Sequence, residues 1–437
     1  MTDSVKDYKI RKLNIKIFIK FQTVVYYRAR RYICNNCKKT FVENNPFGNK
    51  RQRIPNATIL LVLEKLKPYT STFASVGREL DISTTAVVEI FDKHVQIERK
   101  QLTSILCWDE FYFNRHSKYK YAFMIMDFQK KYIVDIVESR QYKILSDYFD
   151  KISPSESDQV RCIITDLYEN YRKLAHIYFP KAILCCDPFH VSKIVTDNFN
   201  TLRKKVMNRY KDNMESIEYK LLKYRYKLLL KPRRELEVEE RYYDRSLCFY
   251  ITERDVVDYI LKIDEKLKKA YYLKEEYLSF NSTYENEFID FKTKEMELLS
   301  YISKLYESNI PECIKTASTL IRWKKEIINS FCWYDHRRLS NGPIEGKNNY
   351  IKIIIGNANG MNNFKRARNK FIYSQNLLER FSHSEIKKPI KRDGAKRGHY
   401  KKKLNVIYFK QKFVIAPSFV LFNSDYLSIK NHDKFQL

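Results

Sequence analysis

The 437-residue sequence contains only eight glycines, none of them between Gly77 and Gly342. Because glycine supplies the strained backbone of tight turns, this scarcity indicates long stretches of regular structure. No apolar run approaches the roughly 18 residues of a membrane span, and the polar, charged segment Met1–Ile10 is unlike a signal peptide. These absences predict a cytoplasmic protein without a membrane partner. Cysteines such as Cys162, Cys185 and Cys186 are then core thiols or metal ligands rather than disulfides.

The composition limits the class of partner. Hydrophobic residues make up 44% and aromatics 15% of the chain, which excludes a disordered protein and allows two or three domains. The formal net charge is +30 and the pI is about 9.5. Such an excess favours a polyanion, because Lys and Arg release counterions when they neutralise phosphates. The alternative is a generally basic protein without such a partner.

The N-terminal segment combines a strand pattern with a pair of cysteines. Leu13–Tyr27 is rich in Ile, Phe, Val and Tyr, which is typical of a β-strand. Cys34 and Cys37 have the Cys-x-x-Cys spacing of half a zinc knuckle. Met1–Ile33 holds neither Cys nor His, and the next histidine is His94. The zinc site is therefore incomplete in the sequence, and the alternative is two free thiols on a hairpin.

A helix-turn-helix pattern follows in a region that reads as helical. Phe73–Leu80 and Thr84–Phe91 each present one apolar face, Ile82 can fill the turn, and Ser83 can cap the second helix. In a basic chain this pattern favours DNA recognition, in which the start of the second helix reads the major groove. The alternative is an ordinary helical hairpin. The expected DNA-contacting residues are Arg78, Thr84, Thr85, Glu89 and Lys93.

The next region alternates between strand and helix patterns. Three strands, a helix, and then alternating strands and helices predict an α/β fold of the ribonuclease-H-like kind. The expected strands are Ser104–Phe113, Tyr119–Phe128, Tyr132–Val137, Val160–Thr165 and Ala182–Cys186, and the expected helices are Tyr142–Ile152 and Tyr168–Phe179.

Two further regions carry less chemistry. Amphipathic stretches such as Ile217–Leu230 and Val256–Leu273 predict a large all-helical insertion, and the alternative is a separate helical domain. Lys387–Lys403 contains nine Lys or Arg and one acid, which is typical of a solvated tail able to grip phosphates. Beyond it, Val406–Phe422 is apolar enough for one or two strands.

Three acids stand out by their surroundings. Asp109 lies inside an apolar strand, where an ionised group is costly unless it is paired or binds a cation. Asp166 ends a buried strand, the position at which α/β sheets hold ligands. Glu345 lies near the start of a helix that Ser340 or Asn341 can cap. For each acid the alternative is a buried ion pair, or a helix cap in the case of Glu345.

Four other polar residues are candidate accessories. Asn349 and Lys352 would share the helix face of Glu345. Asp187 and His190 are three residues apart and can face the same cleft, where they would orient a phosphate or a metal-bound water. The alternative for this pair is a structural hydrogen bond. Three carboxylates suit two Mg²⁺ or Mn²⁺ ions, which can activate a water or a 3′-hydroxyl for phosphoryl transfer.

These segments resemble the ISL-three type of bacterial insertion-sequence transposase, a branch of the DDE transposases. The resemblance covers roughly Tyr27 to Tyr373. It implies that Asp109, Asp166 and Glu345 are the metal-binding triad and that Asp187 and His190 are the accessory Asp-x-x-His. The family's usual second Cys-x-x-Cys is missing upstream of Cys34. The segments that carry the resemblance are Arg30–Cys34 with Cys37 and Phe41, Trp108–Phe111, Thr165-Asp166, Pro180–Ala182, Asp187–His190 and Ser340–Asn349.

The resemblance implies a nucleoid-associated enzyme that binds the inverted repeats of its mobile element, cuts double-stranded DNA and joins the ends to target DNA. A dimer or larger assembly is implied, because two ends must meet. The alternatives are an inactive descendant that only binds DNA and a helical scaffold. The expected domains are a zinc-knuckle-like β segment (1–56), a helix-turn-helix domain (57–101), a catalytic domain (102–191 and 331–379), the insertion (192–330) and a basic tail (380–437).

Overall fold

The computed structural model describes residues 5–18, 21–48, 54–282 and 290–378. All of these belong to one compact unit, Met1–Ser384. The predicted basic tail, including Lys387–Lys403 and Val406–Phe422, lies outside the described residues. Within the described residues, no helix combines the length and apolar character that crossing a membrane requires.

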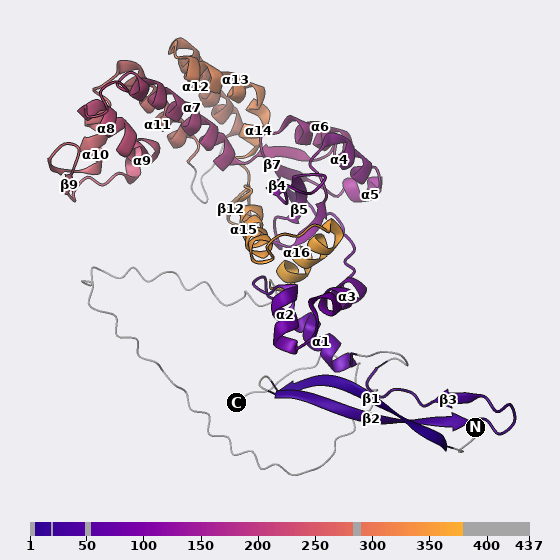
Figure 1. Ribbon diagram of the computed structural model, residues 1–437. Helices are drawn as coiled ribbons and strands as arrows, with labels where there is room; N and C mark the ends of the chain where they lie inside the picture. The colour runs from indigo at the N-terminus through magenta and orange to yellow at the C-terminus, as the bar shows by residue number, and fades with distance from the viewer. Residues whose placement is uncertain (1–4, 19–20, 49–53, 283–289, 379–437) are drawn as a thin grey trace, which may run out of the picture. The chain divides into compact units, whose positions relative to one another are not determined.

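The N-terminal region is a three-stranded antiparallel sheet of order β1-β2-β3 (Figure 1). The single strand predicted over Leu13–Tyr27 is wrong, because β1 ends and β2 begins within it and Leu13 pairs with Val25. The segment contains no glycine or proline that would mark the reversal. The strands are β1 (Val5–Phe18), β2 (Phe21–Ile33) and β3 (Thr40–Val42).

Three short helices follow: α1 (Asn56–Lys65), α2 (Phe73–Leu80) and α3 (Thr84–His94). They share a core that includes Val76, Leu80, Val87 and Phe91. A Cβ at Gly77 would lie 2.9 Å from the carbonyl oxygen of Ile82, so this helix position tolerates only glycine without a backbone shift. As predicted, the Ser83 side chain caps α3 by accepting a hydrogen bond from the Ala86 N–H at 3.1 Å.

The centre of the protein is a mixed five-stranded sheet of order β6-β5-β4-β7-β8, which makes this region an α/β structure. β4 pairs antiparallel with β5, and β5 with β6, whereas β4, β7 and β8 run parallel. Each strand lies within two residues of its predicted bounds. The strands are β4 (Ile105–Tyr112), β5 (Tyr121–Asp127), β6 (Ile133–Val137), β7 (Cys162–Thr165) and β8 (Ile183–Cys186).

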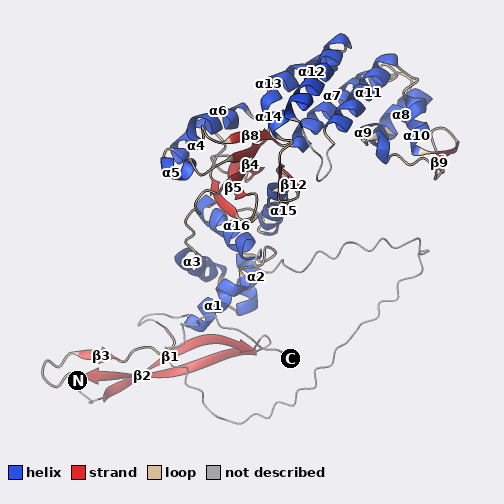
Figure 2. Cartoon of the chain, turned by 180° about the vertical axis from the view of Figure 1, so that it is seen from behind, coloured by secondary structure: helices blue, strands red, loops and turns tan. Residues whose placement is uncertain are grey.

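Helices cover both faces of this sheet (Figure 2). Leu106 and Trp108 of β4 face the helices that connect the strands, while Cys107 and Phe111 face the two helices that follow the insertion. The alternation follows from the period of two along a strand. The connecting helices are α4 (Tyr142–Phe149), α5 (Pro154–Ser157) and α6 (Glu169–Tyr178), and the opposite face is covered by α15 (Gly342–Asn357) and α16 (Phe364–Leu378).

The insertion has its own apolar core, separate from the two cores on the sheet. It is mostly helical, but the prediction of an all-helical insertion is wrong, because β9 (Tyr242–Asp244) and β10 (Phe249–Ile251) form a short antiparallel hairpin. Contact between the Tyr243 and Tyr250 rings, 5.5 Å apart, supports this hairpin. The helices are α7 (Pro188–Asn208), α8 (Ile217–Tyr224), α9 (Tyr226–Leu230), η1 (Arg233–Glu235), α10 (Glu253–Ile260), α11 (Glu265–Phe280), α12 (Phe291–Glu307), α13 (Pro311–Arg322) and α14 (Lys324–Asn329).

The chain returns from the insertion to the sheet through a second small hairpin, β11 (Trp333–Tyr334) and β12 (Arg337–Arg338). The half-buried Arg338 side chain donates hydrogen bonds to the Ser330 carbonyl oxygen at 2.8 Å and to Asn281 Oδ1 at 2.9 Å. These bonds join the hairpin to the end of α11 and fix the entry into α15.

Candidate active site

Three aspartates form a row across neighbouring parallel strands. In the sheet, Cys107 pairs with Ile164, and Thr165 pairs with Cys186. Continuing this register places Asp109 opposite Asp166, and Asp166 opposite Asp187. Paired residues on adjacent strands lie about 5 Å apart, so the row brings three carboxyl groups to one edge of the sheet.

Asp109 is the most constrained of these acids. Its side chain is buried, with 7% of the residue exposed, and it faces α15. Asn348 donates a hydrogen bond from Nδ2 to Asp109 Oδ2 at 2.6 Å, and the Glu110 N–H donates to Oδ1 at 2.8 Å. Burial and, secondly, the negative charge of Asp166 raise the pKa of Asp109 to about 8. A divalent cation beside it would remove this penalty.

Asp187 and His190 form the hydrogen bond that their spacing suggests. Asp187 caps α7 and accepts from His190 Nδ1 at 2.8 Å, and the same nitrogen lies 2.9 Å from Asp166 Oδ1. Burial lowers the pKa of His190, but its hydrogen bonds with the two carboxylates outweigh burial and raise that pKa to about 10. The imidazole therefore carries a positive charge at neutral pH and lies between two acids.

The start of α15 is held against the row. Asn341, one of the two predicted cap residues, is the N-cap of α15, but its side chain makes no capping hydrogen bond. Its amide instead donates to the Trp108 carbonyl oxygen at 3.0 Å and to Asp166 Oδ1 at 3.3 Å. Its backbone N–H donates to Asp187 Oδ1 at 2.9 Å. Asn341 thus contacts β4 and the residues that directly follow β7 and β8, and it fixes the start of the helix that carries Glu345.

Glu345 lies one turn into α15 and faces the other acids. Burial and, secondly, the charge of Asp187 raise the pKa of Glu345. The charge of Asp166 raises this pKa further, whereas His190 lowers it. Asn349 and Lys352, which the helix periodicity assigns to the same face, are exposed.

The five candidate site residues therefore converge, although they are not equally close. Ligand atoms of Asp166, Asp187 and His190 all lie within 4.8 Å of one another. Among the described residues, these three form the one group of potential metal ligands that are this close together. Asp109 and Glu345 do not belong to the group. A divalent cation would have to compete with His190 for the Asp166 oxygen.

Sequence reasoning missed two asparagines of the site. The side-chain oxygens of Asn341 and Asn348 are buried and have no hydrogen-bond partner, while their nitrogens contact Asp166 and Asp109. A buried polar atom without a partner points to a missing ligand or water. Amide and carboxylate oxygens are the ligands that hard cations such as Mg²⁺ prefer, so the donor set fits the expected ion.

The predicted zinc-knuckle cysteines lie on a tight turn. Cys34 is half-buried, Cys37 is exposed, and hydrogen bonds from the Cys37 backbone and thiol lower the pKa of Cys34. Neither cysteine belongs to a group of three potential metal ligands among the described residues. A four-ligand zinc site is therefore not assembled by this part of the chain.

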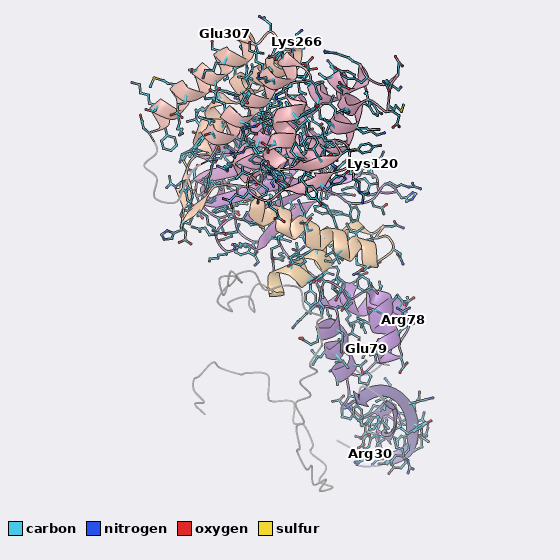
Figure 3. The ribbon with its side chains drawn as sticks, turned by 90° about the vertical axis from the view of Figure 1, so that its left-hand side faces the viewer. Arg30, Arg78, Glu79, Lys120, Lys266 and Glu307 are labelled. Atoms are coloured by element: carbon cyan, nitrogen blue, oxygen red, sulfur yellow. The ribbon has the colours of Figure 1, made fainter. Side chains whose placement is uncertain are left out.

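The predicted DNA-contacting residues lie on the outside of α2 and α3. Figure 3 labels Arg78 on α2. The inner residues Val87, Ile90 and Phe91 are buried as expected. The exposed residues are Arg78, Thr84, Thr85, Glu89 and Lys93.

Comparison with known proteins gives the family. A family model of the DDE ISL-three type, described as "Transposase", matches residues 106–371, which is more than half of the chain. A Lactococcus lactis subsp. lactis protein named "ATP-dependent protease" is 30% identical over 129 residues, which are 29% of this chain and 36% of that protein. The chain thus spans little more than a third of that relative's length. With the family match covering the sheet, the insertion and the start of α15, this chain belongs to the ISL-three type of DDE transposases.

Proposed function

We propose that the protein binds the inverted repeats at the ends of an insertion sequence and catalyses metal-dependent cleavage and strand transfer there. The observation that carries this proposal is that the charge of Asp166 contributes to raising the pKa of both Asp109 and Glu345, which supports a shared site for the three acids. The family match supports a DNA-cutting enzyme in general. DNA as the partner also agrees with the formal net charge of +30.

The central sheet supports assignment to the ribonuclease-H-like fold. Its first three strands are antiparallel, and the next two run parallel to β4 with helices between them. On this assignment the catalytic domain comprises residues 102–191 and 331–379, interrupted by an insertion at 192–330.

Asp109, Asp166 and Glu345 would hold the ions, two Mg²⁺ or Mn²⁺. When bound, such ions supply charge stabilisation to the attacking and leaving oxygens of a phosphoryl transfer. Asn348 would orient the carboxylate of Asp109 through the 2.6 Å hydrogen bond. Asp187 and His190 would position Asp166, since the imidazole joins the two acids.

Residues 57–101 would form a helix-turn-helix domain. The close approach of Gly77 to the turn and the Ser83 cap support this assignment. The exposed start of α3, with Thr84 and Thr85, would enter the major groove. Lys93 would contact a phosphate, while Arg78 and Glu89 would border the contact. Two ends must be brought together, so a dimer or larger assembly on DNA is part of the proposal.

The direct test is cleavage of duplex DNA that carries the element's own ends, with Mg²⁺ or Mn²⁺. The wild type should cut and join these ends, and Asp109→Ala should bind them without cutting. Glu265→Gln is a matched control, because this acid is 84% exposed and lies on the insertion. Equal products from the wild type and Asp109→Ala would reject the enzymatic proposal and leave a DNA-binding descendant.

A further inference from the structure

The hairpin of β1 and β2 has two chemically different faces. Tyr8 pairs with Arg30, Ile10 with Arg28, and Lys12 with Tyr26. Directly paired residues, and residues two apart along a strand, lie on the same face. Tyr32 and Phe41, whose rings stack at 5.3 Å, extend this face onto β3. We call the following set the outer hairpin face: Tyr8, Ile10, Lys12, Tyr26, Arg28, Arg30, Tyr32 and Phe41.

The opposite face is covered by the protein itself. Leu13 and Ala29 are buried there, and the Tyr27 ring packs edge-on against Phe47 at 5.7 Å. On the same face, Arg31 forms an ion pair with Asp7. The apolar groups and the Arg31–Asp7 pair of this face therefore already have intramolecular partners, while Lys9 on the same face is exposed.

The outer hairpin face exposes large apolar groups instead. Ile10 is 66% exposed, Tyr26 65% and Tyr8 52%. A large apolar surface left open in a folded chain marks an interaction site. Because these side chains alternate with Lys12, Arg28 and Arg30, the expected partner offers both negative charge and flat or apolar surface.

The charges on this face have one sign. No Asp or Glu belongs to the outer hairpin face as defined above; at its border, Glu43 Oε2 lies 3.8 Å from Arg30 Nε. The Arg28 guanidinium lies 4.8 Å from the centre of the Tyr8 ring. An arginine held over an aromatic ring keeps its charge available for a phosphate, while the neighbouring apolar surface can contact sugars and base edges.

We propose that the outer hairpin face binds a DNA duplex. This surface would contact DNA in addition to α3, and its binding would not require zinc. A two-stranded ribbon fits the major groove of B-form DNA. Lys12, Arg28 and Arg30 would contact phosphates, while Tyr26 and Ile10 would contact sugars and base edges. This inference rests on the proposed function in one respect, namely that DNA is the substrate.

The test measures binding of the full chain to a duplex carrying the element's end, by fluorescence anisotropy at several salt concentrations. Arg28→Ala should weaken binding and lower the slope of log affinity against log salt by about one phosphate contact. Tyr26→Ala should weaken binding at least about fivefold with an unchanged salt slope. Lys9→Ala, which removes one exposed charge from the opposite face of β1, should bind within about twofold of wild type. Circular dichroism checks that each variant is folded.

Three results would overturn the inference. Arg28→Ala and Tyr26→Ala could bind the duplex as tightly as the wild type; they could dissociate a dimer in sedimentation experiments without changing DNA affinity; or the wild type could prefer the single strand of the same sequence. In each case, cleavage by the wild type but not by Asp109→Ala would leave the proposed function standing. A wild type that neither binds nor cuts the duplex would instead reject the proposed function itself.

Discussion

Trp108 and Asp109 are neighbours on β4, yet their side chains lie on opposite faces of the sheet. Trp108 is fully buried and stacks on Phe149 with ring centres 5.1 Å apart. Asp109 points to the other face of the sheet and contacts Asn348. One face of the strand therefore packs against aromatic rings, while the other holds a carboxyl group whose ionised form is disfavoured by burial.

The difference separates stability from function along a single strand. The packing face surrounds Trp108 with aromatic rings, including Phe123 and Phe179, each with its centre 5.6 Å away. The other face keeps a carboxyl group whose pKa is raised to about 8. A fold under selection for stability alone would place an apolar residue at this position, so Asp109 indicates a functional requirement.

The largest expected effect is on catalysis at Asp109. Asp109→Asn should lower the rate of end cleavage at least about a thousandfold, because a neutral amide cannot replace a metal-binding carboxylate. Single-turnover cleavage assays with Mg²⁺ measure this loss. The melting temperature should stay equal or rise, since the asparagine cannot ionise, whereas burial disfavours the ionised form of Asp109. A variant that unfolds would contradict the assignment of Asp109 to function rather than to stability.

The next effect is on stability at Trp108. Trp108→Ala should lower the free energy of unfolding by about 3–5 kcal/mol, because it leaves a cavity among aromatic rings. Urea denaturation measures this change. Trp108→Phe is the control: it keeps an aromatic ring and removes an indole N–H that has no hydrogen-bond partner, so the loss should stay below about 1.5 kcal/mol. Equal losses for both variants would contradict the packing role.

A smaller effect is expected at Asn348, which links α15 to Asp109. Asn348→Ala should reduce cleavage about 10- to 100-fold, since the 2.6 Å hydrogen bond would orient the carboxylate that we propose as a metal ligand. Asn357→Ala is the matched control, because this asparagine is exposed at the far end of the same helix. If the two alanine variants cleave at the same rate, the positioning role of Asn348 is wrong.

The last prediction concerns the dependence of stability on pH. The folded state holds the Asp109 proton up to a pKa of about 8, whereas the unfolded chain releases it near 3.8. Between these values the folded state binds more protons, so Asp109 makes the protein less stable as pH rises. Melting curves without metal should show this decline for wild type relative to Asp109→Asn, and Mg²⁺ at pH 8 should reverse it. A constant difference between the two proteins across this range would contradict the assignment.

Much of the fold follows from local pattern. The five strands of the central sheet are short apolar runs with β-branched residues, and they lie close to their predicted bounds. The division of Leu13–Tyr27 into two strands could not be predicted, since no turn residue marks it. The hairpin of β9 and β10 could not be predicted, because strands of only three residues are too short to show an alternating pattern.

The candidate site was predicted as residue types rather than as geometry. The sequence motifs single out Asp109, Asp166 and Glu345. Which of these acids lie next to each other depends on the register between strands that are far apart in the sequence. Asn341 and Asn348 could not be recognised, because neutral amides are common in loops and helices alike. Only the pairing of β4 with β7 and the docking of α15 reveal that their amides contact the acids.

Manganese placed by its anomalous scattering would test the central claim most directly. Crystals of the protein with Mn²⁺ should show an ion about 2.0–2.3 Å from oxygens of at least two of Asp109, Asp166 and Glu345. The third carboxylate should bind the second ion. An ion bound elsewhere, or these three carboxyl groups directed apart with His190 still joining Asp166 to Asp187, would contradict the account.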